Sequence, residues 1–432
     1  MNSAVRVLLF PVGSYGDVHP FLGLACELQR RGRQVRLYTS EHFRSLAEQS
    51  GVDFRAVDTT EEYQKAIRQR DLFHPLRGFG TIARNIILPW QRRHYDLVVD
   101  EISNDGPDFL LVGSALAQGL QMAHEKFGVP FATIHLQPSV LWSDIQPPRL
   151  TRRMPAGSAM PRWWNAGLFR LAEKIMVDSV LKRPTNQFRR ELGLRPIARS
   201  TQLWHSPQKI IGMFPDWYAP PQPDWPKQTV LTGFPLWDES ELGSLDAEVS
   251  AFLDAGDPPI VFTPGSAMLN GQSFFAEASA ACQTLGRRGV LLTRFPEQLP
   301  SKLPRDVRHF AYVPLSQLLP RSAALVYHGG IGTLSQACAA GVPHLIMPLS
   351  HDQPDNAERI ERLRLGSTLY PAQFQAKNIA EKLRYLLQSN ETSVACREIS
   401  ARLANHQGVV RAADEIDRML TNRRSVDFES SE

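Results

Sequence analysis

The sequence predicts an α/β protein in which two doubly wound, Rossmann-like domains face a central cleft. Short apolar runs alternate with amphipathic stretches near the N-terminus, and the same alternation returns after about residue 258. The chain has 432 residues, which is too long for one ordinary core. A run rich in proline, at 214–226, separates the two blocks and suits an interdomain connection.

The first block opens on an apolar strand that leads through a glycine-containing turn into a helix. Phe21, Leu24, Ala25 and Leu28 recur at helical spacing, and Gly32 ends the helix. The expected strands of this block are 5–12, 35–39, 109–113 and 130–135, with helices at 20–31 and 115–127. Strands separated by helices in this way form parallel sheets that are covered on both faces.

The second block repeats this pattern. Its expected strands are 259–263, 290–293, 324–327 and 344–347, with helices at 274–285, from 333 and from 354. We therefore expect an N-terminal domain at 1–220 and a C-terminal domain at 221–432. A last amphipathic helix, at about 408–422, is expected to pack back on the first domain.

Composition argues against several classes of protein. A formal net charge of +4 gives no concentrated basic face for nucleic acid. No apolar run approaches the roughly 18–20 residues of a membrane-spanning helix, and the N-terminal stretch lacks the flanks of a secretory signal. Cys26, Cys282, Cys338 and Cys396 stand apart without metal-ligand spacing, which favours reduced structural thiols in a cytoplasmic protein.

The alternation breaks at about 137–204, where basic residues are interleaved with aromatic ones. Trp163, Trp164 and Phe169 lie among arginines and lysines. One interpretation is an element for a membrane surface or an apolar acceptor, since such helices combine Lys and Arg with aromatic residues. The other is an excursion whose aromatic side chains pack on the first domain, which is the commoner use of buried aromatic residues.

The first segment that could carry chemistry is the turn between the first strand and the first helix. Gly13 and Gly16 allow a ligand to approach closely, and the helix start offers N–H groups to an anion. The glycine spacing is not that of a dinucleotide fingerprint, and the second strand does not end in an acidic residue. Asp17 is a candidate general base, with helix capping as its alternative. His19 is a second candidate base.

The most informative segment follows a strand of the second block. The strand ends in His328, and Gly330, Gly332 and Thr333 follow at a helix start. This order places an imidazole, glycine N–H groups, a hydroxyl and the positive end of a helix around one anion site. The arrangement resembles a diphosphate clamp, although it lacks the lysine of a P-loop.

Two other turns could contact the same ligand. Gly265 permits close approach and Ser266 offers a hydroxyl to phosphate, although an ordinary strand-to-helix turn would look alike. The loop 350–356 carries His351, Asp352, Gln353, Asp355 and Asn356. Carboxylate and amide groups side by side, as at 352–356, can hold adjacent hydroxyls of a sugar. A polar surface loop is the alternative for this second turn.

These segments together resemble the donor-binding signature of family-1 glycosyltransferases. That signature has an aromatic-x-Pro element, a His with glycines and a hydroxyl residue, a Gly-Val-Pro, and an Asp-Gln with a nearby Asn. The resemblance implies that Tyr312 stacks on the nucleobase, that Val313 pairs with it through its backbone, and that Asp352 and Gln353 grip the sugar. The implied diphosphate contacts are Gly13, Gly265, Ser266, His328, Gly330, Gly332 and Thr333.

The N-terminal turn is similar to that of bacterial members that act on lipids, sterols and antibiotic aglycones. In those members the aspartate at the position of Asp17 acts as the base. Plant members use a His that is supported by an Asp on a later strand. No carboxylate lies at the corresponding place near Ser114, so Asp17 is expected to act directly.

Segments that begin at His205, Asp216 and Thr232 resemble the rhamnosyltransferases of rhamnolipid synthesis. That branch implies a deoxythymidine diphosphate sugar and a hydroxy-fatty-acid acceptor. Gln336 stands where uridine-using plant members carry a Glu for the ribose hydroxyls. Because a neutral amide is a poorer acceptor for a diol, this residue favours a deoxyribose.

The resemblance implies the GT-B architecture and an inverting transfer of a rhamnose- or glucose-type hexosyl group from a dTDP- or UDP-sugar. The first domain would bind the acceptor and the second the donor, and neither cofactor nor metal would be needed. An alternative is transfer from UDP-glucose to a polyketide, sterol or carotenoid aglycone. We expect a monomer or weak homodimer, with peripheral membrane association as an open alternative.

Three other classes remain as alternatives. A glycosidase would need two carboxylates that flank one bond, and Asp17 and Asp352 would have to supply them. That assignment leaves the diphosphate clamp without a purpose. An epimerase of nucleotide sugars would share the cleft, but its acid and base residues are not apparent in the sequence. A catalytically inactive partner protein is the third alternative, and the intact Asp17, His328 and Asp352 disfavour it.

Overall fold

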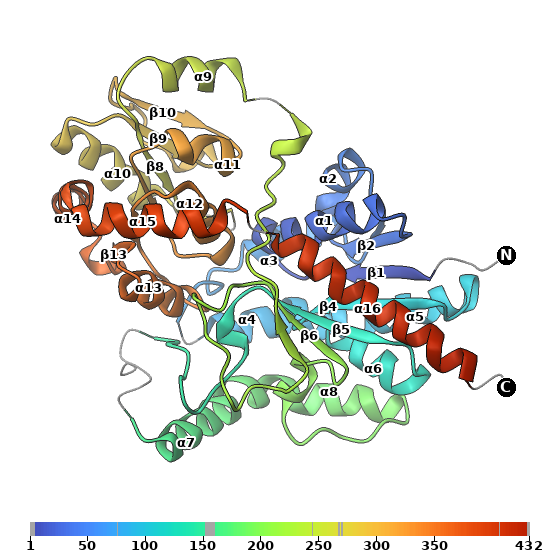
Figure 1. Ribbon diagram of the computed structural model, residues 1–432. Helices are drawn as coiled ribbons and strands as arrows, with labels where there is room; N and C mark the ends of the chain where they lie inside the picture. The colour runs from blue at the N-terminus through green and yellow to red at the C-terminus, as the bar shows by residue number, and fades with distance from the viewer. Residues whose placement is uncertain are drawn as a thin grey trace.

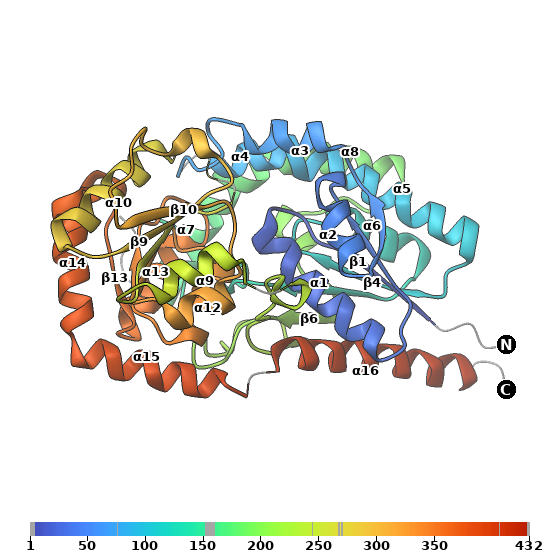
Figure 2. The same ribbon diagram turned by 90° about the horizontal axis from the view of Figure 1, so that it is seen from above.

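The computed structural model describes residues 5–429, with gaps at 76, 152–159, 244, 267, 269–270 and 406. Two parallel sheets form the centres of two lobes that lie side by side (Figure 1, Figure 2). The strands from the N-terminal half of the chain build the first lobe, and those from the C-terminal half build the second. The predicted fold class, two Rossmann-like units, is confirmed.

The first lobe contains a seven-stranded sheet in the order β3-β2-β1-β4-β5-β6-β7. The strands are β1 (Arg6–Phe10), β2 (Val35–Thr39), β3 (Asp53–Ala56), β4 (Phe109–Ser114), β5 (Phe131–His135), β6 (Lys209–Gly212) and β7 (Thr229–Leu231). The central pair runs parallel from Arg6↔Phe109 to Phe10↔Gly113. These central strands are almost continuously apolar because helices cover both of their faces.

The second lobe contains a six-stranded sheet in the order β10-β9-β8-β11-β12-β13. The strands are β8 (Ile260–Thr263), β9 (Gly289–Leu292), β10 (Val307–Phe310), β11 (Ala324–Tyr327), β12 (His344–Ile346) and β13 (Gly366–Thr368). All neighbouring strands are parallel. Their carboxyl ends therefore share one edge of the sheet, which is where open α/β sheets bind ligands.

Helices pack on both faces of each sheet (Figure 2). Those of the first lobe are α1 (Tyr15–Arg30), α2 (Arg44–Gln49), α3 (Thr60–Ile67), α4 (Gly78–Ile82), α5 (Leu88–Asp105), α6 (Gln118–Phe127), α7 (Arg162–Ala172) and α8 (Ser179–Glu191). Those of the second are α9 (Ala247–Asp254), α10 (Gln272–Leu285), α11 (Leu315–Leu318), α12 (Ile331–Ala340), α13 (Gln353–Arg362), α14 (Ala376–Gln388) and α15 (Asn390–Leu403), and α16 (Gly408–Glu429) ends the chain. The four cysteines are unpaired.

The first lobe extends beyond the expected boundary at residue 220. β7 pairs with β6, so residues up to 231 belong to the first sheet. The proline-rich run at 214–226 was predicted to connect the lobes, and this prediction is wrong. The run lies between β6 and β7 and packs on the second lobe. Tyr218 is fully buried, and its hydroxyl donates to Asn356 Oδ1 at 2.7 Å. Arg359 Nη1 donates to the Tyr218 carbonyl at 3.1 Å. The aromatic residues between the prolines thus make this run an interface.

The last helix, α16, returns from the second lobe and lies along the first (Figure 2). It packs on α1. Arg31 Nη1 binds Asp414 Oδ1 at 2.7 Å and Asp417 Oδ2 at 2.9 Å, and Lys209 Nζ binds Glu415 Oε2 at 2.9 Å. None of the helices in the described ranges is both long and apolar enough to cross a membrane.

Candidate active site

A cavity of about 830 Å³ lies where the two lobes meet. Its walls come from the turn after β1 and from the turns after β8, β9, β10, β11 and β12. Every one of the thirteen site residues predicted from the sequence lines it: Gly13, Asp17, Gly265, Ser266, Tyr312, Val313, His328, Gly330, Gly332, Thr333, Gln336, Asp352 and Gln353. The parallel topology accounts for this gathering, because strand ends far apart in the sequence share one edge.

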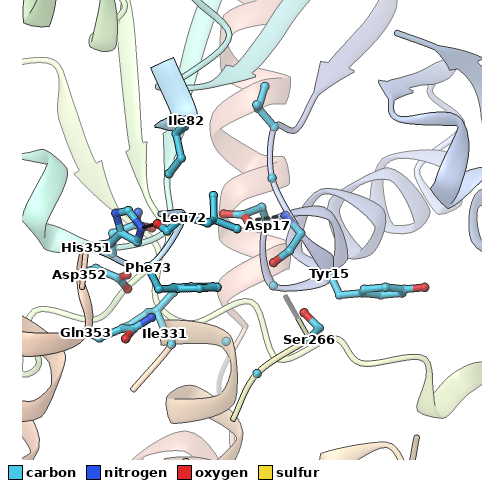
Figure 3. A pocket seen from close by; sticks show the side chains of 18 of the residues that line it. Tyr15, Asp17, Leu72, Phe73, Ile82, Ser266, Ile331, His351, Asp352 and Gln353 are labelled. Carbon is cyan, nitrogen blue, oxygen red and sulfur yellow. Dashed lines mark hydrogen bonds between the residues drawn. The ribbon is translucent and has the colours of Figure 1, made fainter. Parts of the chain in front are cut away.

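Asp17 lies in the first turn of α1, which begins at Tyr15, five residues earlier than predicted. Its Oδ2 accepts the backbone N–H of Ser14 at 2.8 Å, so the carboxylate caps the helix and faces the cavity at once (Figure 3). Gly13 has φ +141°, and a Cβ there would overlap the Asp17 carboxylate. Only glycine at this position leaves room for the carboxylate. The absence of a side chain at Gly13 therefore allows the Asp17 carboxylate to occupy its observed position.

The protein environment of Asp17 favours the protonated carboxyl group more than bulk water would. Burial raises the pKa of the carboxyl to about 6, and the hydrogen bond from Ser14 acts in the opposite direction. A carboxylate with such a pKa is a stronger base than an exposed one and is still ionised at neutral pH. His19, the other candidate base, also lines the cavity, but its Nε2 lies 2.9 Å from Glu239 Oε1.

His328 follows β11 and is enclosed by two of the predicted glycines. A Cβ at Gly265, which has φ +101°, would lie 2.7 Å from His328 Cε1. A Cβ at Gly330 would lie 2.5 Å from His328 Nε2. Both glycines therefore make space for the imidazole, a role that the sequence comparison did not assign to them. His328 Nδ1 is buried and has no hydrogen-bond partner among the described residues.

Burial lowers the pKa of His328 to about 4, so the ring is neutral at pH 7. A neutral imidazole can donate one N–H and adds no positive charge to the cavity. The N-terminal end of α12, which starts after Gly330, points its free N–H groups into the same part of the cavity. Thr333 and the buried Gln336, both on α12, line it as well.

The loop after β12 divides into a part that faces the cavity and a part that supports it. Asp352 and Gln353 line the cavity (Figure 3). Gln353 Oε1 accepts the N–H of Leu349 at 2.8 Å, which fixes the side chain. Burial raises the pKa of Asp352 to about 7, and the nearby Asp17 carboxylate adds to the rise. The charge of Asp17 in the first lobe therefore raises the pKa of Asp352 in the second.

Asp355 and Asn356, which belong to the same predicted polar loop, use their side chains within the protein. Asp355 Oδ2 accepts from Arg359 at 2.7 Å. The fully buried Asn356 donates to the Gly329 carbonyl at 2.9 Å and to Asp352 Oδ2 at 2.7 Å. Of the expected sugar-binding stretch 352–356, only the first two residues face the cavity. Asn356 orients Asp352 from behind.

Tyr312, the expected platform for a nucleobase, lies beyond β10. Its hydroxyl donates to the Asp238 carbonyl at 2.7 Å, and the Asp238 carboxylate accepts from the N–H and the hydroxyl of Ser316. The ring is partly exposed toward the cavity, whereas the adjacent Val313 is buried. These bonds hold the Tyr312 ring in one orientation.

Several cavity residues were not anticipated from the sequence. Arg294 follows β9 and places its guanidinium 4.0 Å from the ring centre of Tyr15 and 5.0 Å from that of Tyr312. It is the one lysine or arginine among the described residues that the second lobe contributes to the cavity. The rule that located Gly265 and His328, polar residues at strand ends, applies equally to Arg294.

A loop of the first lobe reaches the part of the cavity beside Asp352 and Gln353 (Figure 3). His351, in the left-handed backbone region with φ 61°, places its Nε2 2.9 Å from the carbonyl oxygen of Leu72. The rings of Phe73 and His351 are 6.1 Å apart. Leu72 and Phe73 lie beside Asp352 and Gln353 in Figure 3. This loop forms a wall that the sequence did not reveal.

The part of the cavity within the first lobe is mainly apolar. Its lining residues include Phe79, Ile82, Trp90, Trp142, Phe169, Met176 and Trp204. Two π-helical turns, Ala83–Ile87 between α4 and α5 and Glu173–Asp178 between α7 and α8, contribute further side chains. Such turns widen a helix locally and often occur at functional sites. A large apolar pocket therefore adjoins Asp17.

Two family models match this chain, one in each half of the sequence. Residues 7–143 match the glycosyltransferase family 28 N-terminal domain. Residues 291–422 match the C-terminal domain of erythromycin biosynthesis protein CIII-like proteins. The first match contains the turn with Asp17, and the second contains Arg294, the His328 turn and the Asp352–Gln353 pair.

Full-length similarity agrees with these matches. The chain is 29% identical to O-mycaminosyltylonolide 6-deoxyallosyltransferase of Streptomyces fradiae, over 97% of this chain and 98% of the relative. It is 26% identical to sterol 3-beta-glucosyltransferase UGT80B1 of Arabidopsis thaliana, over 99% of this chain and 70% of the relative.

Solved structures share the architecture. The glycotransferase of kitacinnamycin superposes with a TM-score of 0.73 at 20% identity and covers 96% of this chain and 99% of its own. Spinosyn rhamnosyltransferase SpnG complexed with thymidine diphosphate gives 0.68 at 16% identity, over 95% of this chain and 100% of its own.

Fold, site and similarity together define a nucleotide-sugar glycosyltransferase with the GT-B architecture. In the pairing of its two halves the chain is similar to glycosyltransferases with a family 28-type N-terminal domain and to erythromycin biosynthesis protein CIII-like C-terminal domains.

Proposed function

We propose that this enzyme transfers a hexosyl group, with inversion, from a deoxythymidine diphosphate sugar to a hydroxyl of an apolar, lipid-like acceptor. Asp17 takes the proton of the acceptor hydroxyl as its oxygen bonds to the anomeric carbon. The bond between that carbon and the diphosphate oxygen breaks in the same step. The electron pair leaves with the diphosphate, toward His328 and the N-terminal end of α12.

One observation carries this proposal. A single cavity joins the Asp17 carboxylate of the first lobe to the clamp around His328 in the second lobe. The order of strand ends along the second sheet supports the direction of the donor. Tyr312 follows β10, Gly265 follows β8, His328 follows β11 and Asp352 follows β12. That order matches base, diphosphate and sugar in turn, and it brings the sugar end toward Asp17.

The donor assignment is supported by Gln336 and by the charge of the clamp. Gln336 is buried against the cavity and offers an amide where a carboxylate would better bind a ribose diol. The helix end and the N–H groups supply stabilisation to the leaving diphosphate, a task that a divalent cation performs in other transferases. We therefore propose that the reaction needs neither a metal nor a cofactor.

Binding of nucleotides tests the donor assignment directly. Thymidine diphosphate should raise the unfolding temperature more than uridine diphosphate at equal concentration, because the pocket beside Gln336 favours a deoxyribose. Addition of a chelator should leave both the binding and the turnover unchanged. A uridine diphosphate preference would redirect the donor assignment to UDP-glucose, and a strict metal requirement would contradict the proposed clamp.

The acceptor assignment is supported by the lining of the first lobe. Aromatic and aliphatic side chains dominate it, and Trp90, Trp142 and Trp204 are prominent among them. Arg84 also lines this region and forms no salt bridge among the described residues. An amphiphile with an apolar body and an anionic group, such as a hydroxy fatty acid, suits this combination. The relatives named for O-mycaminosyltylonolide and sterol transfer favour the second candidate, a rigid aglycone of similar polarity.

A lipid-like acceptor would reach the cavity from a membrane surface, and α7 has the side chains for such a contact. Phe169 and Met176, on α7 and the π turn after it, line the cavity. On the opposite side, Trp163, Trp164, Leu171 and Ile175 are 72%, 49%, 54% and 61% exposed. Exposed Arg170 and Lys174 lie among them. We therefore propose that this face contacts anionic lipid. Both interpretations of the aromatic-basic stretch then apply to one helix: one side packs on the first lobe, and the other contacts the membrane surface.

Flotation with vesicles tests this contact. The protein should bind vesicles of phosphatidylcholine and phosphatidylglycerol, and lose binding about tenfold on Trp163→Ser with Trp164→Ser, since these rings supply the apolar contact. Tyr385→Ser, on α14, removes a 63% exposed ring elsewhere and serves as the matched control. Equal binding by all three proteins, or no binding of the unmodified protein, would contradict the contact.

A further inference from the structure

We propose that Arg294 binds the diphosphate of the donor while it is stacked on Tyr15 of the opposite lobe, so that donor binding fixes the turn that carries Asp17. This inference rests on the proposed donor class and adds a residue and a coupling between the lobes. Four observations support it: the position of Arg294, its charge, the geometry of its guanidinium, and the support of Tyr15.

Arg294 stands at the right place along the donor. β9 lies between β10 and β8 in the sheet, and Leu292 at its end pairs with Phe310 of β10. Arg294 therefore emerges between Tyr312 and the Gly265 turn. A nucleotide that extends from Tyr312 to the Gly265 turn must pass this guanidinium. The position matches the link between nucleoside and phosphate.

Charge gives a reason for an arginine here. A nucleoside diphosphate carries at least two negative charges, and the neutral His328 ring supplies none to balance them. Among the described residues of the second lobe, Arg294 is the one basic side chain, lysine or arginine, that lines the cavity. Charged hydrogen bonds from a guanidinium to phosphate are among the stronger contacts available to a protein. Arg294 thus supplies the missing charge.

The stacked geometry leaves the guanidinium able to bind phosphate. Arg294 Cζ lies 4.0 Å from the ring centre of Tyr15 and 5.0 Å from that of Tyr312. Such stacking uses the flat face of the guanidinium, whereas its N–H groups project from the edge. The nearest carboxylate contact is loose, since Glu239 Oε1 is 4.0 Å from Nη2. A phosphate can therefore replace Glu239 without breaking the stack.

Tyr15 is a firm platform that belongs to the catalytic turn. Its hydroxyl shares a hydrogen bond of 3.3 Å with His42 Nε2, and its ring packs edge-on against Phe43 with centres 5.0 Å apart. Tyr15 and Asp17 both lie in the first turn of α1. Because the two residues share this turn, a contact that fixes Tyr15 against the second lobe also fixes the position of Asp17. Nearby, a Cβ at Gly332 would lie 3.7 Å from Gly16 Cα, so the two lobes already meet at this point.

A double-mutant cycle on thymidine diphosphate affinity tests the proposal. Arg294→Ala should weaken binding about 10- to 100-fold, and Arg294→Lys should recover part of the loss, because lysine keeps the charge but not the planar stack. Tyr15→Ala should weaken binding about fivefold, whereas Tyr15→Phe, which keeps the ring, should bind like the unmodified protein. The double variant Tyr15→Ala, Arg294→Ala should be no weaker than Arg294→Ala alone.

Controls separate this role from a merely structural one. Arg321→Ala removes a guanidinium of the second lobe that pairs with Asp254 away from the cavity, and it should leave affinity unchanged. Arg294→Ala should also reduce the salt dependence of nucleotide affinity, which a folding defect would not do selectively. Affinity within twofold of normal in Arg294→Ala would overturn the phosphate contact, and additive effects in the cycle would overturn the coupling. Failure of the unmodified protein to bind any nucleoside diphosphate would instead overturn the proposed function.

Discussion

Asp17→Asn is expected to lower the turnover of sugar transfer by about 10³-fold while nucleotide affinity stays within about twofold. The variant removes the group that we propose as the proton acceptor, and general base catalysis contributes effects of about 10²–10⁴. The amide oxygen of Asn can still accept the Ser14 N–H, so the start of α1 should be preserved. Measurement of kcat with saturating donor, beside calorimetric binding of thymidine diphosphate, checks both parts.

The pH dependence of the unmodified enzyme should identify the same residue. Burial raises the pKa of Asp17 to about 6, so transfer should decline as the pH falls below about 6 and the carboxylate gains a proton. Near-normal turnover in Asp17→Asn would contradict the assignment. His19→Asn, which alters a residue bound to Glu239, is the matched variant and should retain most of the activity.

Stability provides an independent control for Asp17. The pKa in the folded protein, about 6, lies above the ordinary value of 3.8, so the protonated form is the one that the fold favours. The stability that this group contributes is full below about pH 4 and is lost as the pH rises through about 6. At pH 8 the buried charge costs about 3 kcal/mol, so Asp17→Asn should unfold at a higher temperature there. The difference should vanish near pH 4.

His328→Ala is expected to reduce kcat/KM for the donor by about 10²–10³-fold. In the proposed mechanism the neutral ring presents an N–H to the leaving diphosphate. Removal of one such preorganised donor typically has an effect of this size. The lack of a side chain at Gly265 and Gly330 leaves space that the His328 ring fills. The variant therefore leaves a gap beside these two glycines. Steady-state kinetics with varied donor measures the loss.

The neighbouring structure provides the comparison for His328. His328→Asn restores an N–H donor in a smaller side chain and should recover part of the activity. Gly330→Ala keeps the histidine but places a methyl group 2.5 Å from its Nε2, so it should displace the ring and resemble His328→Ala. A loss of less than tenfold in His328→Ala would contradict a role in stabilising the leaving group.

Apolar periodicity predicted the elements that build the site. The strands at 35–39 and 324–327 were expected within a residue of their observed bounds, because parallel strands covered on both faces are continuous apolar runs. The sequence also indicated His328, Gly265 and Asp352, since each follows such a run. Arg294 follows a run of the same kind and was missed because no known motif drew attention to it.

Elements whose structure depends on distant partners were predicted less well. β7 has only three residues and pairs with β6, so local pattern does not distinguish it from a loop. The run 214–226 was expected to be a connection because of its prolines. Tyr218 within it is instead buried against Asn356 and Arg359, which lie more than a hundred residues further along the chain. Local propensity carries no information about such contacts.

The sequence by itself determined the two parallel sheets and the residues that their strand ends present, because both follow from apolar patterning and short-range turn chemistry. Only the tertiary structure decided which of those residues face the cavity and which support it. Asn356 is enclosed and orients Asp352, Gly13 makes room for Asp17, and Arg294 reaches Tyr15 across the lobes. These roles depend on packing between segments distant in the chain, and that packing is settled only when the lobes meet.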